Sequence, residues 1–150
     1  MRKIEKQIVD IICGGTLYIG EKRLSSRDRI VRDDGGAYHV FLHDTEIALV
    51  EPWSRRMRIT MHGFGTPTTM SRIRALLEGF HSDFYLTRDP KQRYDEYSEW
   101  TGNYKSRGEP LLISPAGQMA HIRDTEVLVF SDRIQYWNDD YDFWEDYPAL

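Results

Sequence analysis

The feature that most constrains the fold is an alternation of side chains in TEIALVEPWSRRMRITMHG (45–63). In its second half, apolar and polar residues take turns: Met57, Ile59 and Met61 between Arg56, Arg58 and Thr60. Successive side chains of a strand point to opposite faces, so the pattern is typical of an antiparallel sheet with one face buried. Pro52 and Ser54 interrupt the stretch, which therefore predicts strands at 45–50 and 56–62 joined by a short turn.

A second hairpin is predicted in DTEVLVFSDRIQYW, with strands at 125–130 and 133–137. Its start nearly repeats the start of the first hairpin, Asp124-Thr125-Glu126-Val127 against Asp44-Thr45-Glu46-Ile47. An ancient duplication and one hairpin solution used twice are both open interpretations. We favour the second, because four positions are a short match and no helix-like segment follows the second copy.

Two segments show the apolar period of a helix, about 3.6 residues. Residues 2–12 place Ile4, Ile8, Ile11 and Ile12 on one face, and Gly14-Gly15 would end the helix. Residues 69–79 have an apolar face made of Met70, Ile73, Leu76 and Leu77. We expect Thr68 to cap this second helix, because a threonine hydroxyl accepts from free N–H groups of the first turn, and Gly79 to end it.

The remaining segments divide into short strands and one long loop. We expect strands in TLYIG, KRL, 29–32, AYHVFL, DFYLT and PLLIS. Because the segment 88–110 is polar and aromatic, a long loop is predicted there. The sequence as a whole predicts an α+β fold: a twisted antiparallel sheet of roughly five to seven strands, with helix 69–79 packed on one face and the N-terminal helix nearby.

Length and composition fit one domain, residues 1–150, with a real core. Hydrophobic residues make up 40% and charged residues 29%, as in ordinary globular proteins. The single cysteine, Cys13, excludes an intrachain disulfide. No run approaches the roughly 18 apolar residues of a membrane helix, and Glu5, Lys6 and Asp10 interrupt the apolar start. We therefore expect a cytosolic protein that does not bind membranes.

The stretch HGFGTPTT (62–69) has glycines and hydroxyls but lacks the lysine of a phosphate-binding loop. A helix N-terminus with hydroxyls at Thr66, Thr68 and Thr69 still suits an anion, for example a nucleotide signal that the protein sequesters. The favoured interpretation is a strand-to-helix turn with a threonine cap, because capping threonines are common.

A basic patch would form if the hairpin arginines Arg55, Arg56 and Arg58 lay beside Arg72 of the second helix. Together with the threonine-rich turn, such a patch would bind nucleic acid through its phosphates and would lose affinity as salt rises. Arg74 cannot share this surface, because residues two apart lie about 200° from each other around a helix. Solvated strand and helix faces are the competing interpretation.

Residues suited to metal binding or acid–base chemistry are scattered. The five histidines have no metal-binding spacing: His39, His43, His62, His81 and His121. Glu46 and Glu126 would form a pair for acid–base work only if the fold brought them together. We therefore expect no enzymatic activity, no catalytic residues, no metal and no cofactor.

The C-terminal YWNDDYDFWEDY (136–147) mixes acids with aromatics, and residues 81–150 hold 14 acidic against 7 basic side chains. The mixture is similar to the negative, partly apolar surface of nucleic-acid-mimicking proteins, and Trp and Tyr are frequent binding hot spots. The candidate partner-binding residues are Trp137, Asp139, Asp140, Tyr141, Asp142, Trp144, Glu145 and Asp146. The alternative is a last strand or helix whose aromatics pack on the sheet while its acids face water.

A pattern of spaced residues runs through 43–74: His-x-Thr-x-Ile, a hairpin, then Gly-x-x-Thr-x-Thr-Thr-x-x-Arg-Ile. It is carried by His43, Thr45, Ile47, Gly63, Thr66, Thr68, Thr69, Arg72 and Ile73. In this pattern the chain resembles a family of small tailed-bacteriophage proteins of unassigned function, and FSDRI (130–134) is similar to the family's second hairpin. The chain departs from the family's glycine, tryptophan and asparagine at His62, Phe64 and Arg74. The resemblance implies a phage origin and an α+β fold, and it carries over no catalytic residue.

These observations predict a phage accessory protein in the host cytoplasm. We expect it to bind and inhibit a host protein, such as a defence or transcription complex, through the C-terminal surface. A nucleic-acid-binding module built on the basic patch and a nucleotide-sequestering protein are the alternatives. The sequence leaves the oligomeric state open.

Overall fold

The structure, a computed structural model, describes residues 1–15, 17–98 and 100–148. Its helices are α1 (Lys3–Gly14) and α2 (Pro67–Phe80). Its strands are β1 (Gly20–Arg23), β2 (Asp28–Arg32), β3 (Tyr38–Leu42), β4 (Thr45–Glu51), β5 (Arg56–Ile59), β6 (Tyr85–Ser98), β7 (Asn103–Ile113), β8 (Met119–His121), β9 (Val127–Phe130), β10 (Arg133–Asn138) and β11 (Phe143–Asp146).

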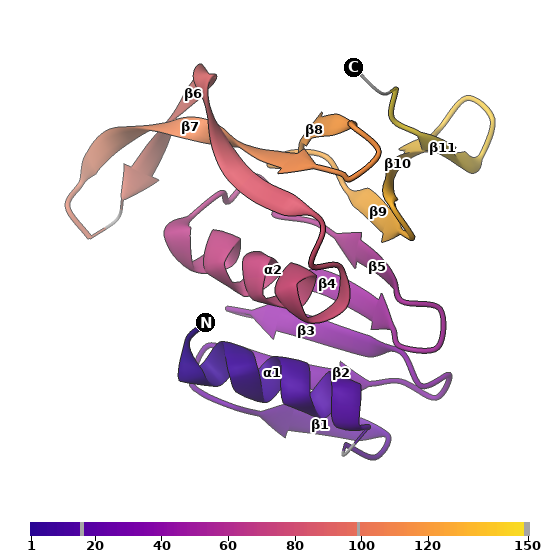
Figure 1. The fold of residues 1–150 in the computed structure, drawn as a ribbon. Coiled ribbons are helices and arrows are strands. Elements are labelled where there is room, and N and C mark those ends of the chain that lie inside the picture. The colour runs from indigo at the N-terminus through magenta and orange to yellow at the C-terminus, as the bar shows by residue number, and fades with distance from the viewer. Residues whose placement is uncertain (16, 99, 149–150) are drawn as a thin grey trace.

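The strands form two antiparallel sheets. The larger sheet has eight strands in the order β1-β2-β3-β4-β5-β9-β10-β11, and the smaller has three in the order β6-β7-β8. Figure 1 shows α1 and α2 side by side on one face of the larger sheet, and β6 packs against α2. The predicted α+β class with an N-terminal and a central helix is confirmed. The larger sheet alone exceeds the predicted range of strands, because it takes in the C-terminal hairpin.

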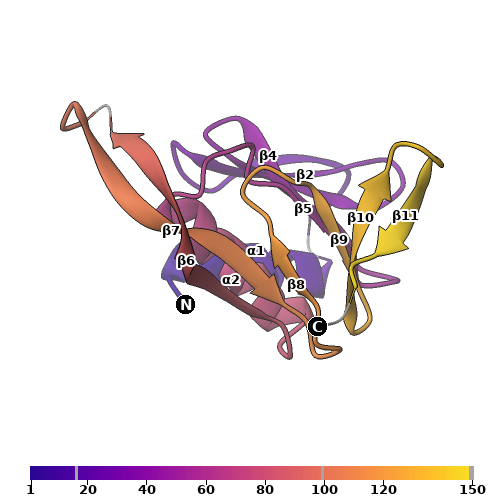
Figure 2. The same cartoon turned by 90° about the horizontal axis from the view of Figure 1, so that it is seen from above.

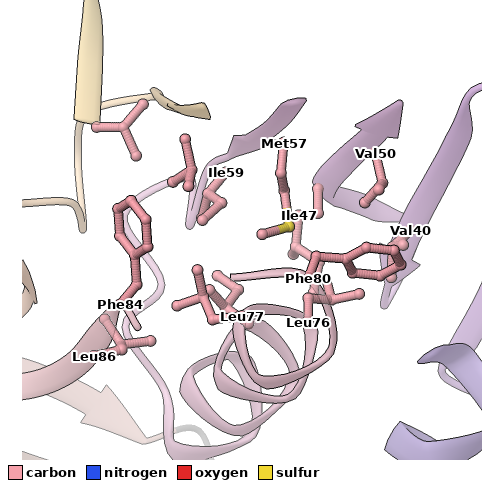
Figure 3. Close-up of a cluster of buried hydrophobic side chains, with 14 of the residues drawn as sticks. Val40, Ile47, Val50, Met57, Ile59, Leu76, Leu77, Phe80, Phe84 and Leu86 are labelled. Atoms are coloured by element: carbon pink, nitrogen blue, oxygen red, sulfur yellow. The ribbon is translucent and has the colours of Figure 1, made fainter. Parts of the chain in front are cut away.

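The core lies between the larger sheet and α2. Figure 3 shows Met57 and Ile59 of β5 facing Leu76 and Leu77 of α2. The apolar positions of the alternating stretch, Met57, Ile59 and Met61, are at most 1% exposed. The intervening polar residues are partly or fully exposed: Arg56, Arg58 and Thr60. The predicted alternation is confirmed, and each fully buried apolar side chain contributes about 1.5–3 kcal/mol to holding the sheet against the helix.

The start of α2 differs from the prediction by two residues. Thr66, not Thr68, caps the helix, and its hydroxyl oxygen accepts from the N–H of Thr69 at 3.2 Å. Pro67 follows at the first helical position. Proline suits that position because its φ is already helical and the N–H that it lacks would have no partner there.

The helix ends differ in the role of their glycines. Gly15 ends α1 in the left-handed conformation with φ of 59°, close to the prediction. Gly79 does not end α2, which continues to Phe80. A Cβ on Gly79 would lie 2.7 Å from Cγ1 of Val9 in α1. This glycine therefore permits the close approach of the two helices rather than stopping one of them.

A loop is predicted at 88–110, and this prediction is wrong: the segment is most of a long hairpin formed by β6 and β7. A bulge between Asp89 and Arg93 contains Pro90 and interrupts the pairing. Beyond the bulge most side chains on both faces are in water, so no apolar alternation marks these strands in the sequence. Residues 93–98 and 100–108, which we call the arm, extend away from the rest of the protein in Figures 1 and 2.

Several other predicted strands occur with shifted ends. TLYIG contributes only Gly20, the first residue of β1, and its Thr16 lies outside the described residues. The strand predicted at 56–62 ends at Ile59, and the one predicted at 125–130 begins at Val127.

Candidate interaction face

The larger sheet has one covered and one uncovered face. α1 and α2 lie on the first, and no other element of the described chain lies on the second, which we call the open face (Figure 2). The strand register places one residue from each of six strands in a row across this face: His39, Leu49, Arg58, Leu128, Gln135 and Asp146. The open face therefore joins the first hairpin, β4–β5, to the C-terminal hairpin, β10–β11.

Two adjoining hollows lie along the open face. The larger, of about 600 Å³, is lined by His39, Asp44, Thr45, Glu46, Ala48, Leu49, Arg58, Thr60, His62 and Glu126. The smaller, of about 130 Å³, is lined by Leu49, Glu51, Arg56, Arg58, Leu128 and Trp144. Because Leu49 and Arg58 line both, the two hollows form one shallow groove across β3, β4, β5 and β9.

His39 lies in this groove with a carboxylate at each of its ring nitrogens. Its Nδ1 lies 2.7 Å from Glu46 Oε1 and its Nε2 lies 2.8 Å from Asp33 Oδ2. Burial lowers the pKa of His39, but the hydrogen bonds and charges of the two carboxylates outweigh burial and raise it. The imidazolium form of His39 is therefore more stable here than in free histidine.

The structure brings Glu46 and Glu126 to the same hollow, as an acid–base pair would require. Each carboxylate, however, is bound to a different cation. Glu46 contacts His39, and Glu126 accepts from Arg58 Nε at 2.7 Å. The pair is therefore part of a set of ion pairs that lines the groove.

Arginines and aromatic rings stack along the open face. The guanidinium of Arg58 lies 5.4 Å from the ring centre of Trp144, and that of Arg56 lies 5.6 Å from the ring centre of Phe130. Trp144 in turn meets Trp137 edge to face at 5.5 Å. We call these five residues the Arg–aromatic cluster. Each cation–π contact at such a site contributes about 0.5–1 kcal/mol and so favours this orientation of the arginine.

The predicted C-terminal binding residues divide between two strands and a turn. Trp137 is 43% exposed on β10, while Asp139, Asp140, Tyr141 and Asp142 form the exposed turn before β11. On β11 the side chains alternate, so Trp144 and Asp146 share the open face and Glu145 points to the opposite one. Glu145 accepts there from the hydroxyl of Tyr136 at 2.9 Å. The acids therefore do not form a single row beside the exposed tryptophans.

The predicted basic patch is divided as well. Arg56 and Arg58 share the open face, and Arg55 lies in the turn between β4 and β5 with φ of 58°. Arg72 does not join them, because it is 3% exposed and lies in the core. Thr66 caps α2, its hydroxyl oxygen lies 3.0 Å from that of the buried Thr69, and Thr68 is half-buried beside them. The expectation that Arg72 lies on the surface with the hairpin arginines is thus wrong.

Arg72 is instead the centre of a buried ion triad. Its Nε donates to Asp28 Oδ1 at 2.8 Å and its Nη1 donates to Glu5 Oε2 at 2.7 Å. Ser71 and Ser25 also donate, at 2.6 and 2.8 Å, to the same carboxylates. Burial raises the pKa of Glu5 and Asp28, but these hydrogen bonds outweigh it, and both pKa values are lowered. The triad therefore links α1, α2 and β2 through side chains in their ionised forms.

A family comparison matches the part of the chain that contains this triad and most of the groove. The family model described as Kyanoviridae Gp96 protein matches residues 1–101. The chain belongs to the Kyanoviridae Gp96 protein family. The expected phage origin is confirmed at this level. No curated protein and no solved structure matches the chain significantly.

The region matched by the Gp96 family contains Arg58 and the part of the groove on β3, β4 and β5, but not β9, β10 and β11. Trp137 and Trp144 therefore lie outside the matched residues, and the Arg–aromatic cluster spans the C-terminal boundary of the matched region. Among the described residues, no helix is long and apolar enough to span a membrane.

A third hollow, of about 340 Å³, lies at the N-terminus of α2 within the region matched by the Gp96 family. It is lined by Leu42, His43, Thr45, Ile47, Met61, Phe64, Thr66 and Thr69. Five of these belong to the spaced pattern at 43–74: His43, Thr45, Ile47, Thr66 and Thr69. Leu42, Ile47 and Met61 make part of its lining apolar, and His43 and three threonines supply polar groups, so it suits a ligand with an apolar ring and polar substituents.

Sequence reasoning missed the partners of Arg72 and the arm. Glu5 carried a usable signal, because it lies three and seven positions before Ile8 and Ile12 and so shares their buried helix face. An acid on an apolar face predicts a buried cation as its partner. The arm has no such signal, since its strands pair without a buried face.

Proposed function

We propose that this chain is a phage accessory protein that binds a host protein in the host cytoplasm and inhibits it, with the open face as the contact surface. The observation that supports this most is the stack of Arg58 on Trp144, which combines two residue types that dominate protein interfaces. Trp137, which is 43% exposed and contacts Trp144, adds apolar area on the same face. A cluster of arginine and tryptophan on an uncovered sheet face has the composition of a typical hot spot.

The charges of the face favour a protein partner over nucleic acid. Arg58 is paired with Glu126, Arg72 is buried, and the whole chain has a net charge of −4. Phosphate recognition needs cations that are free to meet it. The mixed charges of the groove instead suit a partner surface that also carries both signs.

Affinity capture from infected host cells tests the proposal with two variants of the Arg–aromatic cluster. Trp144→Ala removes the ring and Arg58→Glu reverses the charge, and both side chains lie on the open face. Tyr18→Ala and Lys22→Glu are the matched controls, because both residues are exposed at the β1 end of the chain. We expect one host protein to be recovered by the wild type and the controls and lost with both cluster variants. Recovery of that protein by all five proteins would remove the open face from consideration.

Point variants are preferable here to truncation after Asn138. Such a truncation deletes β11, and with it the backbone carbonyl of Tyr147 that accepts from the buried Gln118 side chain at 2.6 Å. Loss of capture would then report damage to the fold as well as loss of a surface.

The second candidate function is sequestration of a nucleotide signal, and the hollow at the N-terminus of α2 favours it. A bound nucleotide would raise the melting temperature, because a ligand that binds only the folded state stabilises it. A thermal-shift screen of common nucleotides and cyclic dinucleotides that shows no stabilisation at millimolar concentration would exclude this function.

A further inference from the structure

The arm presents aromatic side chains that serve no purpose in the core. Trp100 in the turn between β6 and β7 is 97% exposed, Tyr104 is 71% exposed and Tyr97 is 53% exposed. Figure 2 shows this end of the hairpin extending past the larger sheet and the helices. Exposed tryptophan at a loop tip gains nothing from folding, since its ring stays in water.

The base of the arm is firmly anchored. The carbonyl of Gly65 accepts from the hydroxyl of Tyr94 at 3.0 Å and from Arg88 Nη2 at 2.7 Å. The guanidinium of Arg123 lies 4.0 Å from the ring centre of Tyr94 and also binds both carboxylate oxygens of Glu109. These contacts fix the direction in which the arm leaves the body of the protein.

Cross-strand pairs continue this order along the arm. Arg93 donates to the Ser106 hydroxyl at 3.0 Å, and Glu96 forms an ion pair with Arg107. Tyr97 and Tyr104 face each other with ring centres 5.1 Å apart. A lone two-stranded hairpin is marginal in water, so these pairs and the anchored base are what keep it formed. The aromatic tip is thereby presented in one orientation, which reduces the entropy lost on binding.

The composition of the arm tip indicates a protein partner. Seven of the ten residues from Tyr97 to Ser106 are tyrosine, tryptophan, serine, glycine or asparagine: Tyr97, Ser98, Trp100, Gly102, Asn103, Tyr104 and Ser106. These are the types that binding loops of antibodies use, because rigid rings supply area and small polar residues adapt. Residues 93–108 hold three basic and three acidic side chains. A neutral arm lacks the positive charge that nucleic acid or an anionic membrane would attract.

We propose that the arm is a protein-binding finger that inserts Trp100 into a concave apolar pocket of the partner, with Tyr97 and Tyr104 against the rim. This deepens the proposed function and rests on it in one respect, namely that the partner is a protein. The contact is separate from the open face, because the two surfaces belong to different sheets.

Site-specific photo-crosslinking in infected host cells tests the finger directly. A photoreactive phenylalanine analogue replaces Tyr104 on the arm, Trp137 on the open face or Tyr18 as the control, and mass spectrometry identifies the crosslinked polypeptide. We expect position 104 to capture one polypeptide that position 18 does not. That polypeptide is then purified and titrated against wild type, Trp100→Ala, Trp100→Phe and Trp53→Ala, with Trp53 as an exposed tryptophan away from the arm.

The expected result is a loss of affinity of about ten-fold or more for Trp100→Ala, a smaller loss for Trp100→Phe, and a change within about two-fold for Trp53→Ala. Unchanged melting temperatures would confirm that all variants fold, since both tryptophans are exposed. Equal affinity of Trp100→Ala and wild type would overturn the finger. So would binding of oligo-dT or of phosphatidylglycerol vesicles that depends on Trp100. A crosslink at position 137 without one at position 104 would overturn only the proposal that the arm binds the partner. A crosslink at position 104 without one at position 137 would overturn only the proposal that the open face does.

Discussion

Arg72 is the buried cation between α1, α2 and β2, and replacing it with methionine tests how much the fold depends on it. Its guanidinium donates at 2.7 and 2.8 Å to Glu5 and Asp28, and all three side chains are at most 3% exposed. Methionine fills much of the same volume but leaves two carboxylates together without a cation. Breaking a buried ion group in this way lowers the free energy of unfolding by about 3–5 kcal/mol. Natural proteins have a total free energy of unfolding of roughly 5–15 kcal/mol, so the loss is a large share of the stability.

Urea unfolding followed by tryptophan fluorescence measures this loss. With a slope of about 2 kcal/mol per molar, the unfolding midpoint falls by roughly 1.5–2.5 M. Arg74→Met is the matched control, because Arg74 is exposed on the same helix and donates to the carbonyl of Leu86 at 3.1 and 3.3 Å. Removing that contact lowers the free energy of unfolding by less than about 1.5 kcal/mol. Equal midpoints for the two variants would refute the role given to Arg72.

The loss must also depend on pH in one direction. In the wild type the pKa values of Glu5 and Asp28 are lowered, because their hydrogen bonds outweigh the burial that would raise them. Their contribution is therefore present above the ordinary carboxyl pKa and is lost as the pH falls through the lowered values. Without Arg72 burial dominates, both pKa values rise, and protonation relieves the variant on acidification. The stability gap should narrow from pH 7 to pH 5, and a constant gap would show that the ion triad is not its cause.

Three further predictions concern the helix cap, the histidines and the arm. Thr66→Ala should lower the free energy of unfolding by about 1 kcal/mol, measured in urea, because the cap of α2 is lost, whereas Thr68→Ala should change it by less than half of that. In an NMR titration of the imidazole signals, His39 should titrate above the ordinary value of about 6.5 and His81 below it. The carboxylates around His39 outweigh its burial, whereas burial dominates at His81. The stabilisation from His39 is accordingly full below its unfolded pKa and disappears as the pH rises through the raised pKa of the folded state. Equal NMR titration midpoints for the two histidines would contradict at least one of the two assignments. Gly65→Ala should lower the free energy of unfolding by about 1–3 kcal/mol, measured in urea, because the added Cβ would lie 2.6 Å from the hydroxyl of Tyr94, which anchors the arm. An unchanged urea midpoint would mean that the base of the arm rearranges without cost.

Local pattern was enough to predict the helices, the first hairpin and the buried face of β5. It was not enough for the order of the strands, because β5 pairs with β9 through Ile59 and Val127, which are far apart in the sequence. Local pattern also failed where the burial of a side chain differs from what is usual for its residue type. Glu5 is buried although it is charged, and Trp100 is exposed although it is aromatic. Both exceptions depend on tertiary structure, the first on a cation supplied by another helix and the second on a hairpin that leaves the body of the protein.

The pairing of β5 with β9 also changes how the two surfaces expected from the sequence relate to each other. Arg58 was assigned to a nucleic-acid patch and Trp144 to a protein contact, yet the strand order brings one over the other at 5.4 Å. Arg58 also holds Glu126 at 2.7 Å. A phosphate bound by this guanidinium would have to displace the carboxylate and draw the side chain off the ring. A protein surface that packs on the exposed side of Trp144 would leave both contacts in place and exclude water from them, which strengthens each of them. The stack therefore favours a partner that adds to it over one that must replace it.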